Sequence, residues 1–398
     1  MEFIACFILI VILIRFRVPV GLTLVASAIF LTLLEFGFTR QFFDPFTATI
    51  LNLRTWKLIF TIILVITLGD ILSRQGYLER MVRALKAYVS PRNVARIAPA
   101  LIGLLPMPGG AMVSAPIVEE LAKGSPINAE AKTAANFWWR HIWEPVWPLY
   151  QSVILAAAIL EVSVWRIAYI CFPITLACIV AGLIVIKLPV SSRKTKSNGL
   201  AVFAREMLFS MWPVVFIVIT GIIFKVDLVI SLLTLYITML ILRITDFKMI
   251  YASFRKEFNF DIVLLFLGGL SLMAVIESGQ AAGNTLSSLQ ALGIPIDLVV
   301  FTLPFLVGLL TGLTAAYVGV GFPIVSSALV LTGGLNSGIL LAYAGGLMGI
   351  MVSPVHLCLV LTKRYFGAGF KGLYWRLLPV VILASILVFA VKYLFYPN

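Results

Sequence analysis

The sequence has 398 residues, of which 61% are hydrophobic and only 12% are charged. This composition excludes an ordinary soluble domain and predicts a multi-pass protein of the inner or plasma membrane, in contact with membrane lipid. We expect the net charge of +13 in loops that face the cytoplasm, so no nucleic-acid partner is predicted. The four cysteines, Cys6, Cys171, Cys178 and Cys358, lie in apolar segments without metal-ligand spacing and are interpreted as packing residues.

About ten segments are apolar and long enough to be candidate membrane spans, although some are short or kinked. We therefore predict an all-α polytopic membrane protein. The spans expected in the first half are 2–14, 19–37, 57–72, 134–160 and 163–188. Those expected in the second half are 208–224, 228–243, 260–277, 338–362 and 374–394. Between two of them, the basic stretch from Tyr77 to Val89 suits an amphipathic helix on the cytoplasmic membrane surface.

Two further apolar segments, 93–123 and 297–332, are too long for one span and are broken by small residues. They contain the related patterns L-I-G-L-L-P-M-P-G-G-A-M-V-S-A-P-I-V, from Leu101, and L-V-G-L-L-T-G-L-T-A-A-Y-V-G-V-G-F-P-I-V, from Leu306. Interrupted backbone at membrane depth must be buried in protein or line a water-filled cavity. We predict two re-entrant hairpins, since corresponding breaks in two halves of a chain indicate a transporter's binding site.

The two halves also match outside these segments: Pro145 of E-P-V-W corresponds to Pro354 of S-P-V-H. Five spans per half is an odd number, so the second repeat is expected to be inverted in the membrane. With both termini outside, all but six of the 30 Lys and Arg residues fall on the cytoplasmic side, as the positive-inside rule requires. The six exceptions are Arg40, Arg54, Lys57, Arg166, Lys225 and Lys392. The expected domains are a first inverted repeat (1–190), a cytoplasmic linker (191–206) and a second inverted repeat (207–398).

The first hairpin tip combines prolines, which cannot donate a backbone hydrogen bond, with glycines, which permit positive φ. Its free carbonyl oxygens would suit a cation such as sodium, and the N-terminus of the following helix would favour an anion. A proline-glycine kink in a continuous span is the alternative interpretation. The substrate-binding residues expected at this tip are Pro106, Pro108, Gly109, Gly110, Ala111 and Ser114.

The second hairpin tip carries hydroxyl groups where the first carries prolines. Hydroxyl groups suit a small polar substrate or sodium, and for each of them a bond back to its own helix is an equally good interpretation. In inverted repeats the two tips would meet near the membrane midplane. The substrate-binding residues expected at this tip are Thr311, Gly312, Thr314, Ala315, Tyr317 and Gly319.

The segment F-W-W-R-H-I-W-E-P-V-W-P places a carboxylate at an expected helix break. Pro145 disfavours helix at Glu144 and removes a backbone hydrogen bond, which leaves the carboxylate free to face a cavity. Intramembrane charges are costly and usually functional. Glu144 is therefore the leading candidate for proton or cation coupling, with His141 as a relay partner and Arg140 as a counter-ion. Alternatively, Arg140 and His141 lie at the cytoplasmic interface.

The matching break in the second half, S-P-V-H, has no carboxylate. It contains Ser353 and His356, and an unperturbed histidine titrates near neutral pH. Both residues join the ion-coupling candidates. A histidine that only packs helices together is an equally good interpretation for His356.

The plan of five spans, a re-entrant hairpin and a proline-broken helix in each half resembles the ion transporter superfamily of secondary carriers. The P-M-P-G-G-A-M-V-S-A-P stretch and the W-E-P segment are similar to a prokaryotic permease family within it, domain of unknown function 401. The resemblance implies secondary active transport, usually of organic anions driven by sodium or protons, in a homodimer with elevator movement. The Ser-Asn-Thr hairpin signature of the sodium-dicarboxylate symporters is missing, so the resemblance specifies neither sodium nor a dicarboxylate.

We therefore expect an ion-coupled secondary transporter of a small organic anion such as a carboxylate. Its coupling ion would be sodium or a proton, and no other cofactor is expected. A cation/proton antiporter is the first alternative, and an intramembrane enzyme or lipid-handling protein is the second. Enzymatic chemistry is not expected, because the Walker A, H-E-x-x-H and G-x-S-x-G motifs are missing from the sequence.

Overall fold

The computed structural model describes residues 2–16, 18–105, 110–122, 127–188, 200–278 and 294–396. Every regular element in these residues is a helix, as predicted. Up to residue 188 the helices are α1 (Glu2–Arg15), α2 (Val20–Phe36), η1 (Arg40–Phe42), α3 (Asp44–Leu51), α4 (Leu53–Arg74), α5 (Tyr77–Tyr88), α6 (Pro91–Ile102), α7 (Ala111–Ala122), α8 (Ala129–His141), α9 (Gln151–Ile159) and α10 (Val164–Val185).

The second half has a similar order of helices. They are α11 (Leu200–Val218), η2 (Ile219–Ile223), α12 (Leu228–Ile241), α13 (Phe247–Glu257), α14 (Phe260–Ser278), α16 (Ile296–Thr311), α17 (Thr314–Ala316), η3 (Tyr317–Gly321), α18 (Phe322–Leu329), η4 (Val330–Thr332), α19 (Leu335–Met351), α20 (Leu357–Phe366) and α21 (Phe370–Phe395). Of the expected linker, 191–199 lies outside the described residues, and 200–206 begins α11.

Helices occupy every segment expected to span the membrane, and α5 occupies the stretch expected to be amphipathic. Five helices of the described residues are long and apolar enough to cross a membrane: Leu53–Arg74, Val164–Val185, Ala201–Ile223, Phe260–Ser278 and Phe370–Phe395. Large apolar side chains are exposed along α21 at helical spacing, at Trp375, Leu378, Ile382 and Ile386. Lipid tails would solvate such a stripe, whereas water would not.

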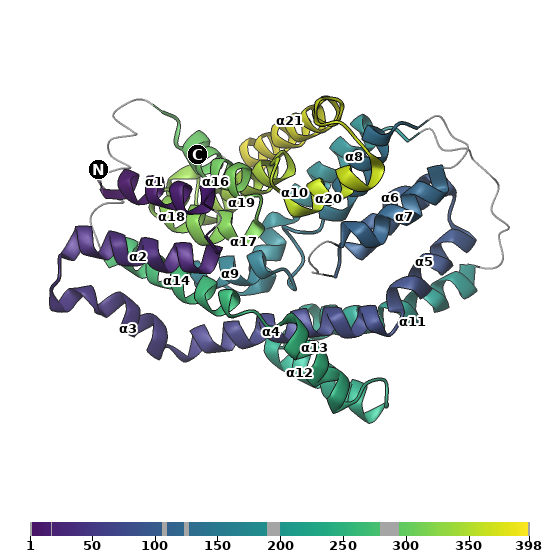
Figure 1. Ribbon diagram of the computed structural model, residues 1–398, viewed down its shortest axis with the longest axis horizontal. Helices are drawn as coiled ribbons and strands as arrows, with labels where there is room; N and C mark the ends of the chain where they lie inside the picture. Colours follow the sequence, from purple (N-terminus) through teal and green to yellow (C-terminus); the bar gives the residue numbers. More distant parts are fainter. Residues whose placement is uncertain are drawn as a thin grey trace.

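Two groups of helices lie above the long α4 in Figure 1, whereas α12 and α13 lie below it. In one group, α16 and α18 pack against α19, whose residues from Ser337 to Met351 are all buried. In the other group, α6, α7 and α20 pack around α8. Helices α10 and α21 contact each other, and both contact members of the two groups.

Glycines allow α16 and α19 to approach backbone to backbone. A Cβ atom on Gly345 would lie 1.9 Å from the carbonyl oxygen of Phe301, and one on Gly349 would lie 2.1 Å from that of Phe305. Small residues at such an interface let helices pack closely without a hydrophobic driving force from water. Helices α16 and α19 therefore pack as closely as their backbones allow.

A buried ion pair ties the last helix to α16. The Nζ atom of Lys392 lies 2.7 Å from Oδ2 of Asp297, and the side chains are 0% and 4% exposed. The hydroxyl group of Tyr393 donates to the same oxygen at 3.0 Å. Lys392, which the charge count places on the outer side at the end of the expected span 374–394, is thus inside the protein.

We expect Lys392→Met to destabilise the protein by about 3–5 kcal/mol, because Asp297 would remain buried with its charge uncompensated. Thermal and denaturant unfolding in detergent would measure the loss. The double variant Lys392→Met/Asp297→Asn should recover most of it. Lys57→Met breaks a half-exposed pair with Asp227 and should cost less than about 1 kcal/mol. Equal losses in Lys392→Met and Lys57→Met would contradict this account.

Candidate functional site

Residues 142–150 interrupt the helical structure between α8 and α9, and we call this segment the first helix break. Neighbouring helices hold this break in place: Thr175 of α10 donates to the carbonyl oxygen of Ile142 at 2.7 Å. The hydroxyl group of Tyr150 donates to the carbonyl oxygen of Gly103, beyond the end of α6, at 2.6 Å. Arg140 and His141, at the end of α8, are both buried within the protein. Their side chains are therefore available to an internal site and are not exposed at a loop.

A second break separates α19 from α20, at residues 352–356. Ser353 and His356 lie in it, and both are buried. The hydroxyl group of Ser353 accepts a long bond of 3.4 Å from the backbone N–H of Val355, so this serine helps to shape the turn. His356 is the residue immediately before α20.

Each break carries the chain from one helix group to the other. Helix α8 belongs to the group of α6, α7 and α20, whereas α9 packs against η3, α14 and α18. In the opposite direction, α19 belongs to the group of α16 and α18, and α20 packs against α7 and α8. The two breaks therefore connect the helix groups, and they come together at the histidines.

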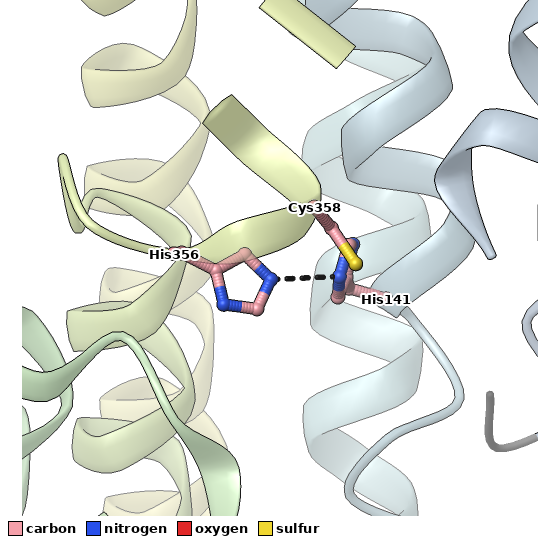
Figure 2. Close-up of side chains that lie close together, drawn as sticks. All are labelled: His141, His356 and Cys358. Atoms are coloured by element: carbon pink, nitrogen blue, oxygen red, sulfur yellow. Dashed lines mark hydrogen bonds between the residues drawn. The ribbon is translucent and has the colours of Figure 1, made fainter. Parts of the chain in front are cut away.

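The only two histidines of the sequence meet where the breaks come together (Figure 2). Their Nε2 atoms are 3.1 Å apart, although the residues are 215 positions apart in the chain. Nδ1 of His141 lies 2.6 Å from the carbonyl oxygen of Phe137, and Nδ1 of His356 lies 2.6 Å from that of Gly312. The structure thus brings together His141, His356 and one residue of the second expected tip.

Gly312 is needed at this place for two reasons. It ends α16 with φ of +64°, in the left-handed region that side chains disfavour. A Cβ atom on it would also lie 2.7 Å from the backbone N and Cα atoms of His356. The second tip and the second break are therefore in direct contact.

Glu144 completes the cluster. Its Oε1 atom lies 3.8 Å from Nε2 of His141, and the residue is only 4% exposed. Its Oε2 atom has no hydrogen-bond partner within the described part of the chain. Arg140 is buried nearby and supplies a positive charge. Sequence reasoning missed Cys358, whose sulfur lies within 4.8 Å of the ligand nitrogens of both histidines. The spacing His356-x-Cys358 was the available signal.

The described part of the first tip adjoins this cluster through α8. Pro106, Pro108 and Gly109 lie outside the described residues, whereas Gly110 and Ala111 are buried where α7 begins. The carbonyl oxygen of Ala111 accepts from Asn136 of α8 at 2.9 Å. Ser114 donates to the same oxygen at 3.2 Å, so its hydroxyl group bonds back to its own helix.

The other residues expected at the second tip differ in their surroundings. The hydroxyl group of Thr311 accepts from the backbone N–H of Leu313 at 3.2 Å, which shapes the tip itself. Thr314 and Ala315 are half-buried. Tyr317 is fully buried with its ring against Tyr343, the centroids being 5.5 Å apart. Gly319 packs against Leu24 and Leu155. Thus Tyr317 and Gly319 lie in the packed core beyond the tip.

A separate cavity of about 420 Å³ lies between α4, α9, α10 and the loop before α12. Arg54, Lys57 and Lys225 contribute three cations to its lining, together with Glu161 and Asp227. Lys57 pairs with Asp227 at 2.8 Å and Arg54 with Glu161 at 3.4 Å. These three cations are among the six that the charge count places on the outer side.

A family model described as "Protein of unknown function (DUF401)" matches residues 2–395. The chain belongs to this family. The resemblance drawn from the P-M-P-G-G and W-E-P segments is thereby confirmed at the level of the family, while membership of the wider superfamily stays a prediction. No curated protein matches the DUF401 chain in sequence.

Among solved structures, the DUF401 chain is similar to the crystal structure of the YdaH transporter of Alcanivorax borkumensis, which is described as having an unusual topology. The TM-score is 0.62 at 12% sequence identity, and the match covers 98% of this chain and 99% of the other. At this identity the likeness shows a shared fold. The DUF401 chain is thus a helical membrane protein with the fold of a known transporter.

Proposed function

We propose that this chain is an ion-coupled secondary active transporter of a small organic anion. The observation that carries the proposal is the contact between two helix breaks from opposite halves of the chain, at the buried ionisable groups of His141, Glu144 and His356. Ionisable groups inside apolar helices are costly and typically mark ion or substrate pathways. Broken helices at such a site are typical of secondary transporters.

The order of helices supports two repeats, 1–190 and 207–398. In each half, two helices precede a short one (α3 or α13), a long helix (α4 or α14) and a helix pair that contains the expected tip (α6 and α7, or α16 and α18). A broken helix and a last long helix (α10 or α21) follow. In this proposal the two repeats are inverted in a cell membrane, with both termini outside, and the helix pairs are re-entrant hairpins. The protein would be a homodimer and would transport its substrate by elevator movement.

The cavity near α4 and α9 supports an anionic substrate. Its volume of about 420 Å³ lies within the usual range for small-molecule sites. Cations lining an entrance raise the local concentration of anions. The lining has three cations against the two carboxylates of Glu161 and Asp227, and this net positive charge would attract the substrate on the outer side. The tips at Gly110–Ser114 and Thr311–Ala315 would hold it further inside.

We expect Lys225→Glu to raise the KM for anion uptake about tenfold at low salt, because it reverses one charge of the cavity lining. The effect should shrink at high ionic strength as the charge is screened. Initial rates in proteoliposomes at two salt concentrations would measure it. Arg40→Glu, on the same expected side but outside the cavity lining, should leave KM unchanged. An equal rise in both variants would contradict a specific entrance.

The decisive experiment is uptake into proteoliposomes across a panel of small carboxylates and other anions. Imposed sodium, proton and voltage gradients would be varied one at a time, and sodium or proton dependence would identify the coupling ion. We expect concentrative uptake of at least one anion under one of the ion gradients. A cation/proton antiporter, the second candidate, is favoured by the lone carboxylate of the described cluster. Proton release on sodium addition, without gradient-driven flux of any anion, would establish that candidate instead.

A further inference from the structure

The hydrogen bonds of the two histidines determine which ring nitrogens carry protons, and this arrangement favours a cation between the two Nε2 atoms. A carbonyl oxygen can only accept a hydrogen bond, so Nδ1 of His141 donates to Phe137 and Nδ1 of His356 donates to Gly312. In the neutral rings both Nε2 atoms then carry lone pairs. These lone pairs face each other across 3.1 Å, which is repulsive unless a positive ion lies between them.

Two further donor atoms converge on the same place. The sulfur of Cys358 and the histidine nitrogens all lie within 4.8 Å of one another, and Figure 2 shows the cysteine beside the ring of His141. The carboxylate of Glu144 reaches to 3.8 Å from Nε2 of His141, with its second oxygen unpartnered in the described residues. Two imidazole nitrogens, a thiolate and a carboxylate are the ligands that zinc prefers.

The geometry is close to that of a tetrahedral site. Ligand nitrogens about 2.0–2.1 Å from zinc are roughly 3.3 Å apart in a tetrahedron, which is near the observed separation of 3.1 Å. The carbonyl oxygens of Phe137 and Gly312 fix both rings from behind, as partners of metal-bound histidines usually do. The ring of Phe137 also packs against both imidazoles, with centroids 4.5 and 5.4 Å away.

We propose that His141, His356, Cys358 and Glu144 form a binding site for a zinc-class transition-metal ion between the two halves of the chain. The negative charges of the thiolate and the carboxylate would balance those of a divalent ion. This balance is needed because Arg140 already adds a positive charge beside the cluster. The thiolate favours zinc over hard ions such as magnesium. His141 ends α8 and Glu144 lies in the break after it, whereas His356 lies in the second break and Cys358 at the start of α20. A bound ion would therefore cross-link the two breaks. Zinc is therefore expected to inhibit any movement that separates them.

Cobalt(II) binding to the purified full-length protein in detergent tests the site. We expect one ion per chain, with the intense visible bands of tetrahedral coordination and a thiolate charge-transfer band, both lost when zinc is added. Cys358→Ser should remove the charge-transfer band and weaken binding at least tenfold. Cys178→Ser, which changes a buried cysteine of α10, should keep both. Unchanged thermal unfolding of the Cys358→Ser protein would show that the fold is intact.

Three results would overturn the proposal: no bound cobalt, an octahedral spectrum without a thiolate band, or a thiolate band that survives in Cys358→Ser. The first would leave a shared proton as the cation between the histidines. Glu144→Gln provides an independent check, because losing the fourth ligand should weaken cobalt binding while the thiolate band persists; unaltered affinity would remove Glu144 from the site. Because the readout is metal binding, failure of this proposal would not affect the proposed transport function.

Discussion

Glu144→Gln is expected to abolish gradient-driven uptake while leaving expression and folding intact. Glutamine has nearly the same shape, so the packing around the break should persist. The substitution removes the negative charge that a bound cation requires in a buried place that also contains Arg140. Hydrogen bonds to charged groups typically contribute about 1.5–3 kcal/mol, so the loss of the carboxylate should weaken ion binding by about 10- to 150-fold.

Uptake under an imposed ion gradient would be compared with substrate exchange at equal ion concentrations. The gradient-driven component should disappear in Glu144→Gln. Glu79→Gln serves as the matched control, because Glu79 is an exposed carboxylate on α5. It should behave like the unmodified protein. If Glu144→Gln retained full concentrative uptake, coupling would have to be assigned to other residues.

Gly312→Ala is the second substitution with a large expected effect. It combines the strain of positive φ with a Cβ atom 2.7 Å from the backbone of His356. The second break would have to move, and the hydrogen bond from His356 to the carbonyl oxygen of Gly312 would be lost. We expect loss of transport and a marked fall in the thermal unfolding temperature.

Gly367→Ala distinguishes the effect of backbone strain at positive φ from the effect of the close contact with His356. Gly367 also has positive φ, of +70°, but open space surrounds the position of its Cβ atom. That variant should lose only about 1–2 kcal/mol from backbone strain and should still transport. Unfolding curves and uptake rates would be recorded for both proteins. Similar behaviour of the two variants would show that the close approach of Gly312 to His356 is unimportant.

The positions of the helices could be predicted from the sequence, because they depend on local properties. Apolar length determines which segments can span a membrane, and prolines remove the hydrogen bonds of the turn that contains them. The breaks at Pro145 and Pro354 follow from those two rules. The basic stretch from Tyr77 likewise formed a separate helix, α5.

The composition of the site depended on packing between distant segments and could not be predicted. The histidines are 215 residues apart, and no sequence pattern places their rings together. The charge count assigned Lys392 to the outer side, because such a count cannot detect the ion pair with Asp297, which is 95 residues away. Similarly, the sequence places Ser114 among the substrate-binding candidates and does not indicate its hydrogen bond to Ala111. Its bond to Ala111 shows that the hydroxyl group is engaged within its own helix.

At both breaks the polypeptide passes from one helix group to the other, and this connection limits how the groups can move. Because α8 continues into α9 in one direction and α19 into α20 in the other, the two groups are joined by a pair of covalent links that pass each other beside His141 and His356. A rotation of one group against the other would displace these links least and the distant ends of the helices most. The contact between His141 and His356 is therefore the position at which such a rotation would displace the two groups least.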